Sequence, residues 1–235
     1  MRPTLLQHAG AWIPLLPLLL AVLSFRRLSP ARIWIAAWCA LLVAQDAIGF
    51  TMGMRGINNL WVGYVFQPVL GGVGLWALSH WQPDDMTRAG LRYAVPLVVV
   101  VNIILILAIE DRRTFSLVAS PFHYITLLLA SLWTFVRLSL ASDESLAKQD
   151  WFWITGGLML FAATSTAIGP LAWYLLRPRV DLLHAMLNVR AASNILAFAA
   201  ITWGMLCPRQ RYSGGFSSRP FSPSSSSSPV SGSRW

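Results

Sequence analysis

The sequence predicts an all-α fold, a polytopic helical bundle that crosses a membrane seven times. Three observations carry this prediction. Hydrophobic residues make up 56% of the 235 residues and charged residues only 11%, whereas soluble domains contain about a quarter charged residues. The mean hydropathy is +0.57. The hydrophobic residues also fall in blocks of about 20, the length of helix that crosses a hydrocarbon core.

Seven apolar segments follow one another along the chain. Their approximate bounds are Ala9–Phe25, Ile33–Phe50, Leu60–Ser79, Tyr93–Ile109, Phe115–Leu140, Trp151–Leu176 and Asp181–Leu206. The linkers are short, as in Arg26–Arg32 and Arg177–Val180, so neighbouring helices run antiparallel. We therefore expect one transmembrane domain over residues 1–208.

The first segment has two interpretations. Arg2 precedes an apolar run, as in a secretory signal peptide, and removal of this segment would leave six helices. The run ends in Ser24-Phe25-Arg26-Arg27 without a small-x-small cleavage pattern. We therefore predict a retained first helix.

Positive residues between the segments predict the orientation. With the N-terminus outside, 11 Lys and Arg residues lie on the cytoplasmic side and 6 on the outer side. Positive charge favours the cytoplasmic side, so the C-terminus is predicted inside, in a cell inner (plasma) membrane. After Cys207-Pro208 the composition turns to Ser, Pro, Gly and Arg, which predicts a disordered cytoplasmic tail over residues 209–235.

The net charge of +9 raises the question of nucleic-acid binding. The positive residues are scattered between apolar blocks and form no basic stripe with interleaved aromatic residues, so no nucleic-acid partner is expected. The two cysteines, Cys39 and Cys207, lie far apart and form no CxxC pair. Neither a disulfide framework nor a zinc ribbon is predicted.

Polar residues inside the predicted spans are the candidate functional residues. A charged side chain in a span is costly and needs a partner or water. Asp46 is the one carboxylate well inside a predicted helix, and Arg190 lies at a similar predicted depth. An ion pair between the second and seventh helices, or a ligand or proton site, would explain both. The full candidate cluster consists of Gln45, Asp46, His184, Asn188, Arg190 and Asn194.

The last predicted helix carries polar residues on two faces. A rotation of about 100° per residue places Asp181, His184 and Asn188 in one sector. Arg190 and Asn194 fall on roughly the opposite side. Such a helix cannot easily present one of these faces to lipid in its outer half. We therefore expect a central, buried helix that lies between other helices or along a cavity that opens outward.

Three histidines fall on the predicted outer side: His8, His123 and His184. With nearby carboxylates they could bind a transition metal or titrate as an external pH sensor. The sequence has no HxxH or HExxH spacing. We therefore expect solvated or hydrogen-bonded loop histidines and no metal site.

Small residues are concentrated in the sixth segment. Gly156-Gly157 opens it, and Ser165 and Gly169 have the small-xxx-small spacing that lets membrane helices approach closely. Close packing with a kink at Pro170 explains these residues, and a hinge is the alternative.

Recognisable enzyme and cofactor motifs are absent from the sequence. It contains no GxSxG elbow, no HExxH motif and no Walker lysine. The single lysine, Lys148, lies in a polar loop. We expect neither catalysis nor a bound cofactor.

Two stretches carry a resemblance to a known group of proteins. They are Trp151-Phe152-Trp153-Ile154-Thr155-Gly156-Gly157-Leu158, and Leu183-His184-Ala185-Met186-Leu187-Asn188-Val189-Arg190 with Asn194-Ile195-Leu196. With Asp46 and Asn59, they resemble uncharacterised bacterial seven-helix membrane proteins, some similar to the membrane sensor regions of histidine kinases. The resemblance covers most of residues 31–206 and implies a sensor-like membrane domain.

The sequence therefore predicts a sensor- or receptor-like membrane protein. It would bind a small ligand from the outer side, or sense the bilayer, and act through a protein partner. Two alternatives stay open. A transporter or channel subunit would also use an intramembrane Asp and Arg, and seven helices can contain a three-plus-three repeat. An accessory or assembly subunit would use its polar residues for packing alone.

Overall fold

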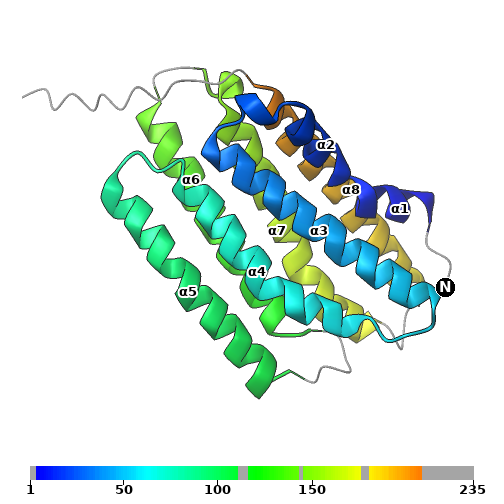
Figure 1. The fold of residues 1–235 in the computed structure, drawn as a ribbon. Coiled ribbons are helices and arrows are strands. Elements are labelled where there is room, and N and C mark those ends of the chain that lie inside the picture. Colours follow the sequence, from blue (N-terminus) through cyan, green and yellow to red (C-terminus); the bar gives the residue numbers. More distant parts are fainter. Residues whose placement is uncertain (1–3, 111–115, 143–144, 176–179, 208–235) are drawn as a thin grey trace, which may run out of the picture.

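The computed structural model describes residues 4–110, 116–142, 145–175 and 180–207, and within these ranges every regular element is a helix (Figure 1). The α-helices are α1 (Leu5–Trp12), α2 (Leu15–Leu23), α3 (Pro30–Met54), α4 (Leu60–Ser79), α5 (Asp85–Ala108), α6 (Ala119–Ala141), α7 (Asp150–Leu175) and α8 (Val180–Leu206). Two 3₁₀ turns, η1 (Phe25–Arg27) and η2 (Leu146–Lys148), lie in the connections. Seven spans are long and apolar enough to cross a membrane. The predicted all-α bundle is therefore confirmed, and the predicted tail lies outside the described residues.

The first span consists of two helices instead of the single predicted one. Thr4 caps α1: its hydroxyl accepts from the Gln7 backbone N–H, and the Gln7 side chain accepts from the Thr4 N–H. The chain breaks between α1 and α2 at Pro14, because proline removes a backbone donor and clashes with the preceding turn. Helix α1 can therefore run in a different direction from α2.

Capping residues explain why some helices begin earlier than the sequence predicts. Ser29 caps α3, and Pro30 occupies its first turn. The Asp84 carboxylate accepts from the Thr87 N–H at 2.7 Å, so α5 begins at Asp85 and not near Tyr93. At the α3–α4 turn, Gly56 takes a φ of 68°, in the left-handed region that glycine tolerates best.

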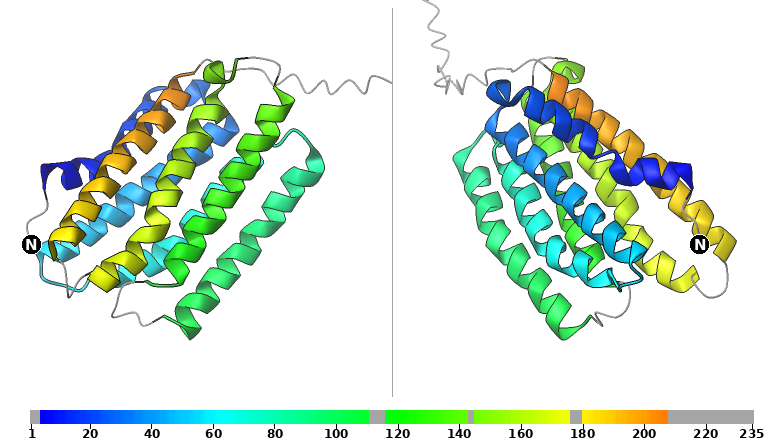
Figure 2. Two further views of the ribbon diagram at one scale, coloured as in Figure 1. Left: turned by 180° about the vertical axis from the view of Figure 1, so that it is seen from behind. Right: turned by 45° about the vertical axis from the view of Figure 1, so that its right-hand side comes forward.

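The helices form a layered bundle with α4 at its centre (Figure 2). Helix α4 packs against α3, α5 and α6, while α7 lies between α6 and α8. Helices α1 and α2 pack on α3 and α8. We expected the last helix to be central, and α8 does lie between α7 and the α1–α2 pair. However, 67% of the α4 window is buried, compared with 39% for α8 and 17% for α5. The innermost helix is therefore α4.

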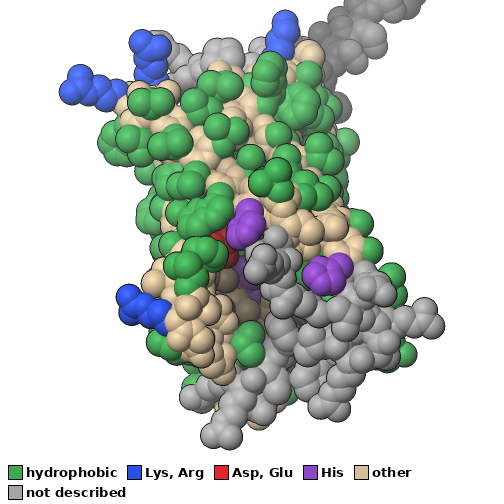
Figure 3. Space-filling view, turned by 90° about the vertical axis from the view of Figure 1, so that its right-hand side faces the viewer, with side chains coloured by type: hydrophobic (Ala, Val, Ile, Leu, Met, Phe, Trp, Pro, Cys, Tyr) green, Lys and Arg blue, Asp and Glu red, His purple; other side chains and the backbone are tan. Residues whose placement is uncertain are grey.

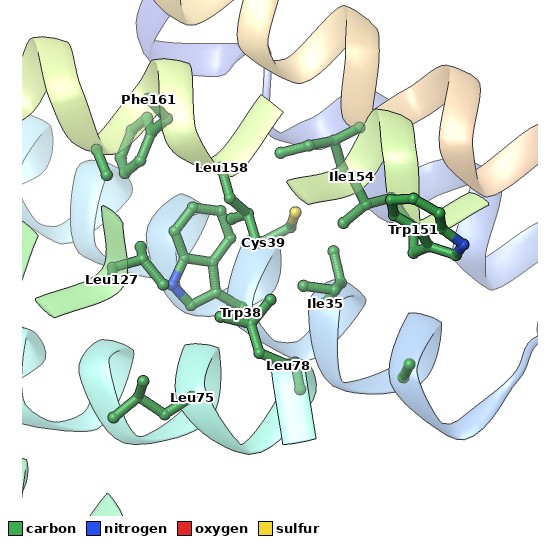
Figure 4. Close-up of a cluster of buried hydrophobic side chains, with 14 of the residues drawn as sticks. Ile35, Trp38, Cys39, Leu75, Leu78, Leu127, Trp151, Ile154, Leu158 and Phe161 are labelled. Atoms are coloured by element: carbon green, nitrogen blue, oxygen red, sulfur yellow. The ribbon is translucent and has the colours of Figure 1, made fainter. Parts of the chain in front are cut away.

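Aromatic packing holds α3, α7 and α8 together in the core (Figure 4). The fully buried Trp38 ring meets Phe161 edge-to-face at 5.3 Å and stacks on Phe198 at 6.1 Å. Helix α7 approaches α8 closely at Gly157, where a Cβ atom would lie 2.5 Å from the Ala197 carbonyl oxygen. This contact confirms the close helix packing predicted for the sixth segment.

Candidate functional site

Four helices bring polar side chains together in the half of the bundle nearer the α3–α4 turn. Asp46 on α3 and Arg190 on α8 interact electrostatically across the space between these helices. Tyr124 on α6 interacts with both charges, and its hydroxyl lies beside the Ser165 hydroxyl of α7. Two predicted amides adjoin this group in the sequence. We call the following residues the interhelical polar cluster: Gln45, Asp46, Tyr124, Ser165, Arg190 and Asn194.

Asp46 and Arg190 do not form a direct ion pair. Among the described residues, the charged side chains within 4.0 Å of each other are Arg32–Asp150, Arg88–Asp85 and Arg137–Asp84. The sequence predicted similar depths for Asp46 and Arg190, with an ion pair or a ligand or proton site between them; the two residues lie within electrostatic range but not within 4.0 Å. The two opposite charges face each other without contact.

Four polar atoms of the cluster are buried without a hydrogen-bond partner in the part of the chain that the structure describes. They are Gln45 Oε1, Ser165 Oγ, Arg190 Nε and Asn194 Oδ1. The Tyr124 hydroxyl lies beside the Ser165 hydroxyl, but the pair does not meet strict hydrogen-bond geometry. A buried group left unpaired costs about 1–3 kcal/mol. The cluster therefore lacks donors and acceptors that a bound molecule or ordered water would supply.

Two of the predicted site residues point elsewhere. The Asn188 side-chain oxygen accepts from the Thr4 hydroxyl at 2.9 Å and from the Gln7 side-chain amide at 3.0 Å. Asn188 thus fastens α8 to α1, and half-buried His184 lies one turn earlier on the same face of α8. Arg190, on the opposite side of α8 from Asn188, lies within electrostatic range of Asp46.

Helix α1 covers the gap between α3 and α8 at this end of the bundle. A Cβ atom on Gly10 would lie 2.8 Å from the Ala191 Cα atom, so the two backbones are in close contact. The rings of His8 and Trp12 meet Phe50 of α3 edge-to-face at 6.3 and 6.4 Å. On this side of the molecule, a histidine and an acidic side chain lie side by side below a largely apolar part of the surface (Figure 3).

A second buried polar group lies where α4, α5 and α6 meet. It contains Gln67, Asn102 and His123, which are 8%, 0% and 1% exposed. The Asn102 amide donates to the Ala119 carbonyl oxygen at 3.2 Å, and the His123 ring packs over Gly71. We expected His123 to be a loop histidine, which is wrong: it lies inside α6. Glycine at position 71 leaves room for the ring.

The opposite end of the bundle holds a closed ion pair. Arg32 Nε donates to Asp150 Oδ2 at 2.8 Å, and Arg32 Nη1 donates to the Met205 carbonyl oxygen at 3.3 Å. The other carboxylate oxygen of Asp150 accepts from the Trp151 N–H at 2.8 Å. This pair joins α3, α7 and α8. Sequence reasoning treated Arg32 as an orientation signal and missed its structural partner.

Glu110 organises the start of α6 outside the membrane spans. Its carboxylate accepts from the N–H groups of Val118 and Ala119 at 2.7 and 2.8 Å, and from the Ser116 hydroxyl at 3.0 Å. Burial raises the pKa of Glu110, but the hydrogen bonds from Ala119, Val118, Ser116 and Leu117 outweigh it and hold the pKa below its ordinary value. The charged carboxylate is therefore an acceptor cap for α6.

Sequence reasoning missed Tyr124 and Ser165, the uncharged members of the cluster. Ser165 lies in the small-residue run of the sixth segment, which predicts close packing or a hinge, and Tyr124 follows a histidine that we expected in a loop. The rotation of each helix about its axis depends on tertiary packing, so the convergence itself could not be inferred.

Neither a metal site nor a known relative defines this cluster. Across residues 4–110, 116–142, 145–175 and 180–207, no group of three or more His, Cys, Asp or Glu side chains is placed to hold a metal ion. No protein-family model matches the chain, and no curated protein and no solved structure shows significant similarity to it.

Proposed function

We propose that this chain is a receptor- or sensor-like multi-pass membrane protein that binds a small polar molecule in the interhelical polar cluster. One observation carries the proposal: two opposite intramembrane charges lie within electrostatic range without forming an ion pair, and four polar atoms of the cluster are buried without a partner in the described part of the chain. Native interiors pair such groups with protein, water or ligand. A bound molecule would complete them.

The position of the cluster suggests how binding would be transmitted. Its residues come from α3, α6, α7 and α8, so a molecule that contacts them all would change the preferred spacing of four helices. A ligand shifts a conformational equilibrium only by its difference in affinity between two states. Contacts to several helices provide that difference, and a protein partner in the membrane or cytoplasm would receive the change.

A transporter is the second candidate, because three spans contain an internal proline. Pro68, Pro96 and Pro170 lie inside α4, α5 and α7, and each helix continues past its proline. Proline inside a helix frees backbone carbonyl groups, and transporters often bind substrate at interrupted helices. Such a protein would expose the cluster to each side of the membrane in turn.

Thiol labelling in sealed vesicles tests the proposal. Cys39 and Cys207 are replaced by alanine, and Ser165→Cys is then exposed to a small, membrane-impermeant methanethiosulfonate reagent from either side. We expect labelling from one side only, because a ligand site is hydrated and reachable. The matched control is Ser131→Cys, also buried and without a partner among the described residues but outside the cluster.

The outcomes separate the candidates. Labelling of Ser165→Cys from both sides would favour the transporter. An unreactive Ser165→Cys, or equal reaction at both serine positions, would overturn the binding proposal and favour an accessory subunit whose polar residues only pack.

A further inference from the structure

We infer that one water molecule is bound between Asn102 of α5 and His123 of α6, within the second buried polar group, where it bridges Asn102 Oδ1 and His123 Nδ1. The site lies outside the interhelical polar cluster and is independent of the proposed function. Three features support it: the contacts that join three helices at this level, two buried polar atoms without partners, and the apolar packing around them.

Asn102 and His123 adjoin each other across the α5–α6 contact. The Asn102 side-chain amide donates from Nδ2 to the Ala119 carbonyl oxygen at 3.2 Å. Ala119 is the first residue of α6, and in an α-helix its carbonyl also accepts from the backbone N–H of His123. The Asn102 amide therefore lies beside the first turn of α6, the turn that leads to His123.

Contacts with α4 fix the position of the imidazole ring. A Cβ atom on Gly71 would lie 2.9 Å from His123 Nδ1 and 3.7 Å from Val98 Cγ1. Val98 lies one turn before Asn102 on the same face of α5. Gly71 thus approaches both the imidazole and the turn of α5 that leads to Asn102. Helices α4, α5 and α6, which pack against one another, meet at this level (Figure 1).

Both side chains carry a buried polar atom without a partner among the described residues. Asn102 is 0% exposed and His123 is 1% exposed, and the two atoms are Asn102 Oδ1 and His123 Nδ1. An amide oxygen only accepts, whereas an imidazole nitrogen donates or accepts according to its tautomer. A water molecule donates to the amide oxygen and either donates to Nδ1 or accepts from it. One water molecule therefore satisfies both atoms in either tautomer, and buried water typically has two to four such partners.

Apolar packing on both sides of this level limits what the site holds. On one side, a Cβ atom on Gly74 would lie 2.9 Å from Leu127 Cδ1, and Leu127 lies one turn beyond His123. On the other side, Ile106 is 8% exposed and lies one turn beyond Asn102. A larger polar molecule would have to displace these apolar contacts. An ion would lie inside a membrane span without a counter-charge on any of these residues, which is costly.

The water bridge would strengthen the attachment of α5 to the bundle. Of the seven described spans, α5 has the smallest buried share, 17% of its window. Polar contacts contribute to the association of membrane helices, because lipid is as apolar as the side chains that it surrounds. The bridge would add a second link to the direct bond from Asn102 to α6.

A crystal structure at a resolution that shows ordered water tests this inference. We expect one isolated density peak about 2.7–3.2 Å from both Asn102 Oδ1 and His123 Nδ1. The protein is crystallised once with sodium and once with N-methylglucamine as the sole added cation, and a water molecule should be present in both crystals. A peak that depends on sodium, a direct Asn102–His123 hydrogen bond, or two ordered side chains without a peak between them would overturn the inference.

One variant and one control locate the water molecule. Asn102→Leu replaces the amide with an apolar group of similar size, and we expect the peak to be lost. Ser131→Ala changes a buried serine of α6 whose hydroxyl also has no partner in the described part of the chain, and the peak should remain. A peak that persists in Asn102→Leu, or that is lost in both variants, would contradict a bridge at Asn102.

Nuclear magnetic resonance of the wild-type protein in detergent tests the inference without any substitution. In protein with isotope-labelled asparagine, a water molecule that stays bound for longer than the protein tumbles gives cross-relaxation peaks to the Asn102 side-chain amide protons. We expect these peaks to have the same sign as peaks between protons of the protein. Peaks of the opposite sign, or no peaks, would overturn the inference.

Discussion

Helix α3 carries one member of each of two oppositely charged pairs, and the pairs differ in how completely their polar groups are partnered. At one end, Arg32 contacts Asp150 at 2.8 Å and also reaches the α8 carbonyl of Met205. In the other half of the same helices, Asp46 and Arg190 interact only across a distance. We call the first the closed pair and the second the open pair.

The comparison shows what a structural ion pair looks like in this fold. The closed pair is 4% and 12% exposed at its two side chains, and its carboxylate receives a backbone N–H as well as the guanidinium. The open pair uses the same residue types, on α3 and α8 instead of α3 and α7, but lacks these contacts. Each pair contains a buried guanidinium nitrogen without a partner among the described residues, Arg32 Nη2 and Arg190 Nε, so the two pairs differ in the direct contact between their charges.

Breaking the closed pair should have the largest effect. Arg32→Gln or Asp150→Asn leaves one buried charge without its partner, which costs about 3–5 kcal/mol. The free energy of unfolding in mixed detergent micelles measures this loss. The control is Asp85→Asn, which removes a salt bridge whose carboxylate is 96% exposed and should produce no measurable change. Equal loss in the two variants would contradict a structural role for the closed pair.

Helices α7 and α8, which hold Asp150 of the closed pair and Arg190 of the open pair, pack closely at Gly157. Alanine substitutions at Gly157 and at its neighbour Gly156 test this contact. Gly157→Ala would place a Cβ atom 2.5 Å from a backbone oxygen of α8, and overpacking of this kind costs about 1–3 kcal/mol. Gly156→Ala has nothing within 4 Å of its Cβ position and should leave the unfolding free energy unchanged or slightly higher. If both substitutions have the same effect, the helices do not meet at Gly157.

The contact between α8 and α1 should contribute less. Asn188→Ala removes the acceptor of two hydrogen bonds from Thr4 and Gln7, with an expected loss of about 1–2 kcal/mol and faster amide exchange in α1. Asn194→Ala is the matched control, because its side-chain oxygen has no partner among the described residues. Slower or unchanged exchange in α1 would show that Asn188 does not hold this helix.

The smallest expected effect is a pH dependence at Glu110. Its folded-state pKa lies below the ordinary value of about 4.3 for glutamate. The carboxylate therefore stabilises the fold above that ordinary value, and this stability is lost as the pH falls through the folded-state pKa. Glu110→Gln should reduce the decline in unfolding free energy between about pH 5 and pH 3. If the unfolding free energy of the variant declines as steeply as that of the wild type, protonation of other carboxylates causes the decline.

Local sequence rules predicted most of the fold. Hydrophobic block length located all seven spans, and the bounds of α4 agree with the expected Leu60–Ser79. Errors arose where one polar contact outweighed hydropathy. The Asp84 cap extends α5 into the polar stretch that begins at Asp85, and Pro14 divides the first span.

The candidate site was less predictable, because it depends on contacts between distant helices. Depth along the helices predicted that Asp46 and Arg190 could interact, and the two lie within electrostatic range of each other. It could not show that Asn188 turns toward α1, or that Tyr124 turns toward the two charges. Those directions follow from how each helix rotates to pack its glycines and aromatic rings.

A pair of double-mutant cycles tests the difference between the open and closed pairs most directly. Unfolding free energies are measured without added ligand for Asp46→Asn, Arg190→Gln and their combination, and for Arg32→Gln, Asp150→Asn and theirs. Groups in contact couple by up to about 3 kcal/mol, whereas independent groups add within about 0.5 kcal/mol. We predict strong coupling for Arg32 with Asp150 and clearly weaker coupling for Asp46 with Arg190, which interact without contact. Strong coupling at Asp46 and Arg190, with stability restored in the double variant, would contradict the open pair and make it a structural ion pair.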